Sequence, residues 1–137
     1  MGGYSGTPLV TKLGVKPGFR VALVNAPRGF KEELGPLPKS AKYKSGTSDS
    51  LDLILVFVSS ENQLMPKFAS LAAKLQKSGM IWVAWPKKSS GVVSDLTFAK
   101  VQRIGLDAGL VDVKICAVNE IWSGLKFVYR LKDRVNK

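Results

Sequence analysis

The feature that most constrains the fold is an apolar run over residues 51–58, which only Asp52 interrupts. The run is too short to span a bilayer, and it lacks the alternation of a strand with one face in water. Such a run is typical of a central parallel strand with helices packed on both of its faces. We therefore expect an α/β fold built around residues 51–58.

Other segments have the composition of strands. Residues 20–25 form a β-branched apolar run, and residues 80–85 form another in which Trp82 and Trp85 are expected to pack in the core. Residues 41–44 indicate a short edge strand, whose lysines would discourage further pairing.

The C-terminal part of the chain predicts a strand pair. Residues 110–118 and residues 125–131 are the two strands, and the loop over residues 119–124 is short enough to require an antiparallel arrangement. The first of these strands alternates apolar and polar residues, which predicts one covered face. The apolar positions of that face are Val111, Val113, Ile115 and Ala117.

Two helices are predicted early in the chain by their end signals. Thr7 is expected to cap a first helix that ends at Gly14, with Pro8 in its first turn. Residues 31–34 indicate a short helical turn.

Two longer helices follow. Ser60 and Gln63 form a capping box that begins one helix, which Pro66 kinks or restarts and Gly79 ends. Ser94 or Asp95 begins the other, which runs to about Ala108. Its inner side is predicted to hold Phe98, Val101, Ile104 and Gly105.

Strands that alternate with helices imply a parallel sheet with right-handed crossovers. We therefore predict a three-layer, mostly parallel Rossmann-like sheet of about five or six strands that ends in an antiparallel strand pair. The length of 137 residues fits a single α/β domain over residues 1–137, with a basic tail at residues 132–137.

The residue types that are absent exclude several kinds of chemistry. The chain has no histidine and one cysteine, Cys116, which excludes Ser-His and Cys-His catalysis and a structural zinc site. It has no phosphate-binding loop of the Gly-x-x-x-x-Gly-Lys-Ser/Thr type, and the turn at residues 25–30 is not Gly-x-Gly-x-x-Gly. We expect no metal or cofactor, and a binding domain rather than an enzyme.

The chain has an unusually high positive net charge. Lysine and arginine total 21 against 10 acidic residues, for a net charge of +11. A positive field attracts polyanions, yet the basic residues are spread along the whole chain. The charge therefore favours a solvated basic surface, with nucleic-acid binding as the alternative. No secretion signal or membrane span is predicted, so we expect a cytoplasmic protein.

The candidate site follows from the topology, because ligands of open α/β sheets bind beyond the carboxyl ends of the strands. The loops expected there offer cations, hydroxyls at a helix N-terminus and an aromatic surface. Ser60 is also a helix cap, the lysines also suit a solvated loop, and Trp122 is equally a stacking surface or a hydrophobic plug. The candidate ligand-binding residues are Asn25, Arg28, Ser59, Ser60, Lys87, Lys88, Glu120 and Trp122.

Several motifs carry a resemblance to a known family. They are GYSGTPL at residues 3–9, WPKK followed by SG at residues 85–91, GLVDVK at residues 109–114 and WSGLK at residues 122–126. Over nearly its whole length the chain resembles a family of small bacterial proteins of unknown function. The resemblance implies a bacterial protein with that family's fold and brings no activity.

The order of elements in the last two-thirds also resembles the later half of a class I methyltransferase domain. In that family a glycine-rich turn holds S-adenosylmethionine, and an acid at the end of the second strand holds its ribose. Here the turn reads Asn-Ala-Pro-Arg at residues 25–28, and no such acid is visible. The resemblance therefore implies the fold without its cofactor site.

These observations lead to three functional hypotheses. The first is a non-catalytic or degenerate α/β domain that binds a small anion, a phosphorylated metabolite or a protein partner at the carboxyl edge. The second is a nucleic-acid-binding accessory protein. The third is a methyltransferase-like transferase with Glu120 or Asp95 as its base.

Overall fold

A computed structural model of the protein describes residues 7–134, so motif residues 3–6 and tail residues 135–137 lie outside the described residues. Its centre is a six-stranded sheet in the order β2-β1-β3-β4-β6-β5. The parallel strands are β1 (Arg20–Val24), β2 (Lys42–Tyr43), β3 (Leu51–Phe57) and β4 (Leu75–Pro86). β6 (Trp122–Tyr129) runs antiparallel to both β4 and β5 (Leu110–Ala117). The predicted mostly parallel Rossmann-like sheet with a final antiparallel pair is confirmed.

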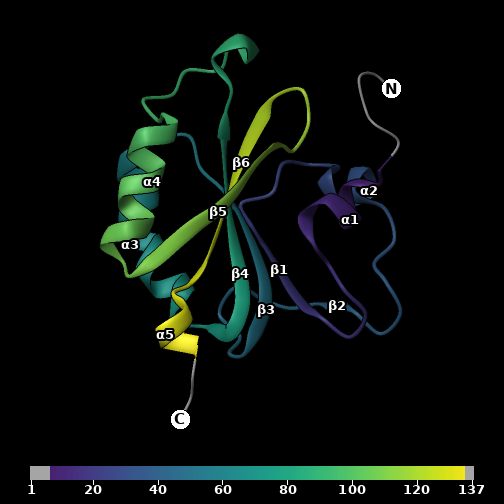
Figure 1. Ribbon diagram of the computed structural model, residues 1–137. Coiled ribbons are helices and arrows are strands. Elements are labelled where there is room, and N and C mark those ends of the chain that lie inside the picture. The colour runs from purple at the N-terminus through teal and green to yellow at the C-terminus, as the bar shows by residue number, and fades with distance from the viewer. Residues whose placement is uncertain (1–6, 135–137) are drawn as a thin grey trace.

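Helices cover both faces of the sheet and complete the three layers (Figure 1). α1 (Leu9–Leu13) and α2 (Phe30–Leu34) lie on one face, while α3 (Glu61–Ala72) and α4 (Phe98–Asp107) lie on the other. A short 3₁₀ turn, η1 (Lys88–Ser90), follows β4, and α5 (Leu131–Arg134) occupies part of the predicted basic tail. Within residues 7–134, no helix combines the length and apolar character needed to cross a bilayer.

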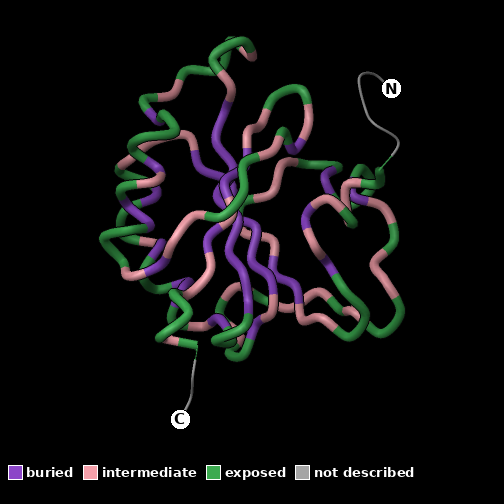
Figure 2. Tube along the Cα trace, viewed as in Figure 1, coloured by how far each residue is buried: buried purple, intermediate pink, exposed green. Residues whose placement is uncertain are grey.

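β3 is buried on both faces, as the sequence predicts for residues 51–58, and β4 is buried in the same way over residues 79–86 (Figure 2). Alternate residues of β3 enter two separate apolar clusters: Ile54 and Val56 pack toward α3 and α4, while Leu53 and Leu55 pack toward α1 and α2. The edge strand β2, by contrast, has no buried residue. The helices on both faces of the sheet therefore pack mainly against these two central strands.

Trp82 fixes α1 to the sheet. Its side chain is fully buried, and its indole Nε1 donates a hydrogen bond to the Leu13 carbonyl oxygen at 2.9 Å. Leu13 is the last residue of α1, which Gly14 ends in the left-handed conformation with φ of 89°, as predicted. The start is shifted by one residue, because Pro8 rather than Thr7 occupies the N-cap position. Trp82 and Trp85 are both in the core, which confirms their predicted role.

Gly79 does not end α3, so that prediction is wrong. The helix ends at Ala72, and Gly79 lies within β4. A Cβ atom at Gly79 would lie 2.9 Å from the Asp52 carbonyl oxygen. Glycine is therefore required there by a close approach of two strands.

The inner face of α4 differs from the predicted one at a single position. Val101, Ile104 and Gly105 are buried as predicted, but Phe98 is 39% exposed. Leu96, which precedes the helix and is buried, fills the core at this end instead.

β5 does not have the single covered face that its alternation predicts. The pairing with β6 shifts register between Asp112 and Lys114, so Val113 is a bulge residue. A bulge reverses the face of every following side chain. Val113 and Ile115 are consequently 52% and 54% exposed.

We predict that Trp82→Phe lowers the free energy of unfolding by about 1–3 kcal/mol, because it leaves the buried Leu13 carbonyl without its donor. Urea denaturation provides the measurement. Trp85→Phe is the control, since it removes a similar area of indole from a side chain with no hydrogen bond in the described structure. Equal losses in both variants would contradict a role for the hydrogen bond.

Candidate functional site

The carboxyl ends of β1, β3 and β4 meet at one edge of the sheet, because the three strands run parallel. The turn between β5 and β6 lies at the same edge, since the antiparallel β6 begins opposite the end of β4, with Trp122 paired to Pro86. All the loops predicted to gather at this edge therefore do so.

Asn25 occupies the point at which the strand order reverses. In the sheet, β2 lies on one side of β1 and β3 lies on the other. The order in which the chain adds strands therefore reverses between β1 and β3. Asn25 follows β1 with a left-handed φ of 58°, and its Nδ2 donates to the Phe57 carbonyl oxygen at 3.4 Å. This bond joins the ends of the two strands.

Two hollows adjoin Asn25. The first, here called the switch hollow, has a volume of about 440 Å³ and extends along α3. Its lining residues are Leu23, Val24, Asn25, Gly46, Thr47, Pro66, Lys67, Ser70, Leu71 and Lys74. The second, of about 450 Å³, lies beside the turn after β1 and is lined in part by Lys31 and Glu32.

Lys87 and Lys88 lie apart from Asn25, in a third hollow of about 540 Å³ here called the β4 hollow. The backbone N–H of Lys87 donates to the Ile121 carbonyl oxygen at 2.8 Å, which fixes the start of this loop against the β5–β6 turn. The residues that line the β4 hollow are Pro86, Lys87, Lys88, Val92, Val93, Ser94, Asp95, Leu96 and Thr97.

Ser59 and Ser60 are engaged in the start of α3. The Ser60 hydroxyl accepts a hydrogen bond from the Gln63 N–H at 3.1 Å, which confirms the predicted cap. Gln63 reaches back to the N–H of Ser59 at 2.8 Å rather than to that of Ser60. The capping box is therefore present in a version extended by one residue.

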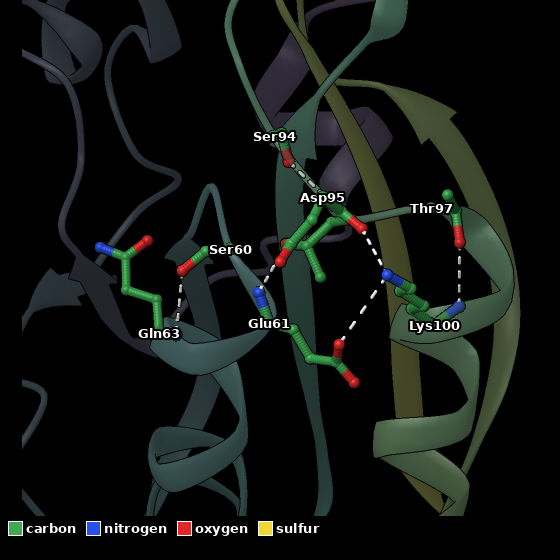
Figure 3. Close-up of polar contacts among 8 residues, drawn as sticks. Ser60, Glu61, Gln63, Ser94, Asp95, Thr97 and Lys100 are labelled. Atoms are coloured by element: carbon green, nitrogen blue, oxygen red, sulfur yellow. Dashed lines mark hydrogen bonds and ion pairs between the residues drawn. The ribbon is translucent and has the colours of Figure 1, made fainter.

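Asp95 does not cap its own helix. Thr97 caps α4, accepting from the Lys100 N–H at 3.2 Å, so the predicted start at Ser94 or Asp95 is wrong. The Asp95 carboxylate instead accepts from the N–H of Glu61 at the start of α3, at 2.9 Å (Figure 3). A carboxylate at a helix N-terminus satisfies a free N–H and interacts favourably with the helix dipole.

Lys100 completes this connection between the two helices. Its ammonium donates to the Asp95 carbonyl oxygen at 3.0 Å and lies 3.9 Å from the Glu61 carboxylate (Figure 3). Because both ion-pair partners are partly exposed, the pair contributes little by itself. The network nevertheless gives Asp95 a structural role.

Trp122 belongs to a strand, not to the predicted loop. It begins β6 and its ring packs edge-on against Phe57, with centroids 5.0 Å apart. Phe57 in turn packs against Phe30, the first residue of α2. Of the two roles weighed for Trp122, hydrophobic packing is the one its surroundings show.

The remaining candidates are Arg28 and Glu120, which are exposed and line none of the hollows described above. Asn119, beside Glu120, joins the β5–β6 turn to α2 by donating to Glu33 Oε1 at 3.2 Å. The candidates thus share one edge but occupy different settings.

The sequence analysis does not identify three polar residues that line the switch hollow: Lys67 and Ser70 on α3, and Lys74 two residues beyond its end. Their three- and four-residue spacing is the signal that could have found them, because such spacing keeps side chains on one side of a helical segment.

No protein-family model and no curated protein sequence matches this chain. Solved structures do match, among them the magnesium protoporphyrin IX methyltransferase of Synechocystis PCC 6803 with bound SAH, with a TM-score of 0.60 and 11% identity over 89% of this chain and 78% of that one.

Two further structures give the same result. A SAM-dependent methyltransferase from Aquifex aeolicus has a TM-score of 0.62 and 13% identity over 87% of this chain and 86% of that one. Aeropyrum pernix fibrillarin, solved with natively bound S-adenosyl-L-methionine, has a TM-score of 0.54 and 12% identity over 88% and 73%. The protein has the Rossmann-like fold of these methyltransferases.

The residues of this chain do not fit S-adenosylmethionine in the way that the class I resemblance implies. Pro27 and Arg28 replace glycines in the turn after β1, and β2 ends at Tyr43 with Lys44, not an acid, following it.

We predict that Asp95→Ala lowers the free energy of unfolding by about 0.5–2 kcal/mol, as for other helix caps, and speeds hydrogen exchange at the Glu61 amide. Asp95→Asn is the control, because its side-chain oxygen can still accept the bond. Denaturation and amide exchange measured by NMR check the result; similar effects of Ala and Asn would count against the cap.

Proposed function

We propose that the protein is a methyltransferase-fold domain that binds a small anionic ligand, such as a phosphorylated metabolite, in the switch hollow. The observation that carries the proposal is the composition of this hollow. It combines Lys67 and Lys74 with the hydroxyls of Thr47 and Ser70, and none of the described residues lining it is acidic. Lysine ammonium and hydroxyl groups are suitable donors to phosphate oxygens.

The position of the hollow supports the same proposal. One end is Asn25, at the reversal of strand order where open α/β sheets bind their ligands. Lys67 lies on α3 and Lys74 lies two residues beyond its end, so the two lysines line the hollow at separate points along its length. An elongated ligand with an anionic group would therefore reach both the edge and the lysines.

A second candidate function is methyl transfer, which the fold of the matching structures favours. The electrostatics of the site argue for the first candidate. S-adenosylmethionine carries a net positive charge at neutral pH, whereas the switch hollow contains lysines and lacks carboxylates among its described lining residues.

We predict that phosphorylated ligands raise the melting temperature, by an amount that grows with ligand concentration over Kd. Differential scanning fluorimetry and calorimetry with inorganic phosphate, pyrophosphate, ATP and S-adenosylmethionine would measure this. Lys67→Gln/Lys74→Gln should abolish the stabilisation. Lys87→Gln/Lys88→Gln, which removes equal charge from the β4 hollow, should retain it.

The ligand panel separates the two functions. If S-adenosylmethionine gave a binding heat and a higher melting temperature while no phosphorylated compound did, the methyltransferase candidate would replace the proposal of anion binding. Equal loss in both double variants would show a general charge effect and contradict binding in the switch hollow.

A further inference from the structure

A cluster of lysines lies on the α1 side of the β5–β6 pair, away from the carboxyl-edge hollows. Lys114 of β5 and Lys126 of β6 are direct cross-strand partners, so their side chains leave the same face of the sheet side by side. Lys12 of α1 reaches this region, since its ammonium lies 3.4 Å from the Ala117 carbonyl oxygen. Segments far apart in the sequence thus bring positive charges together.

The like charges oppose each other. Residues directly opposite in an antiparallel pair have Cβ atoms about 5 Å apart, and like charges there are destabilising. Burial, together with the charges of Lys114 and Lys16, lowers the pKa of the Lys126 ammonium from its ordinary value. Within residues 7–134, no carboxylate lies at salt-bridge distance from Lys16, Lys114 or Lys126.

β5 also segregates its charges between the two faces of the sheet. Asp112 points toward α4, where its carboxylate accepts hydrogen bonds from Gln102 at 3.2 and 3.3 Å. Lys114, beyond the bulge, points the opposite way, toward the α1 side with Cys116. The acid of this strand therefore does not neutralise its lysine.

We propose that this lysine cluster, formed by Lys12, Lys114 and Lys126, binds the phosphate backbone of a nucleic acid. Phosphates would compensate the repulsion between the cross-strand partners Lys114 and Lys126. Lys114 is exposed and Lys12 and Lys126 are half-buried, so the ammonium groups can be reached by a chain of phosphates from solvent. The net charge of +11 adds a long-range attraction.

The test measures binding of a fluorescein-labelled, mixed-sequence oligoribonucleotide by anisotropy at several salt concentrations. Lys114→Gln/Lys126→Gln should weaken binding about tenfold or more at low salt and reduce the slope of log K against log salt by about 0.7 for each lysine removed. Arg103→Gln/Lys132→Gln is the matched control, since both residues are exposed on α4 and α5 and its loss of charge is equal. This control should bind within about threefold of the original protein.

A stability measurement separates binding from damage to the fold. Because the lysine pair is repulsive, Lys114→Gln/Lys126→Gln should unfold at the same or a higher temperature while binding RNA more weakly. The single cysteine, Cys116, supplies a local readout on the same face, where burial raises the pKa of its thiol. Bound RNA should slow its alkylation by iodoacetamide, a neutral reagent.

Several results would overturn the proposal: no RNA binding at low salt, equal weakening in both double variants, or unchanged alkylation of Cys116 at saturating RNA. Binding to phosphatidylserine vesicles that depends on Lys114 and Lys126, without RNA binding, would assign the cluster to a membrane surface instead. None of these results tests ligand binding in the switch hollow, because its lysines are unchanged in these variants.

Discussion

The pairing of β3 with β4 is the constraint on which the rest of the structure depends. Both strands are apolar on both faces, so the sheet cannot leave either face of its centre in water. Helices must therefore pack above and below it, and the connections that carry them back make the strands parallel. That common direction brings the loops after β1, β3 and β4 to one edge. The candidate site is thus a consequence of where apolar side chains had to be buried.

Much of the fold could be predicted because its signals are local. The apolar run of β3, the cap at Ser60 and the glycine after α1 each act over a few residues. The features that were missed depend on segments distant in the sequence. The sequence predicts Asp95 as a cap for the nearest helix, but its partner is the N–H of Glu61, 34 residues away. The sequence predicts Gly79 as a helix end, but the Asp52 carbonyl of a neighbouring strand is what requires glycine there.

The candidate residues lie at the edge of the sheet that the sequence predicts, but they do not form one group. Topology placed Asn25, Ser60 and Lys87 at the carboxyl ends of the strands, and the structure agrees. Which side chains share a hollow depends on packing, which periodicity does not encode: Asn25 joins Lys67 on α3, while Lys87 faces the loop before α4. The fold of the matching methyltransferases is thus combined here with a hollow that contains lysines and no acid among its described lining residues. Shared architecture and differing site chemistry are expected to separate in this way.

The bulge at Val113 has a consequence for how the molecule behaves among copies of itself. β5 is an outermost strand, and outer strands expose backbone groups that can recruit a strand from another chain. An irregular register and an outward Lys114 make β5 a poor template for such recruitment. At the opposite margin β2 is only two residues long, too short to serve as one. An open sheet with a strongly apolar centre is in this way protected at both margins against edge-to-edge polymerisation.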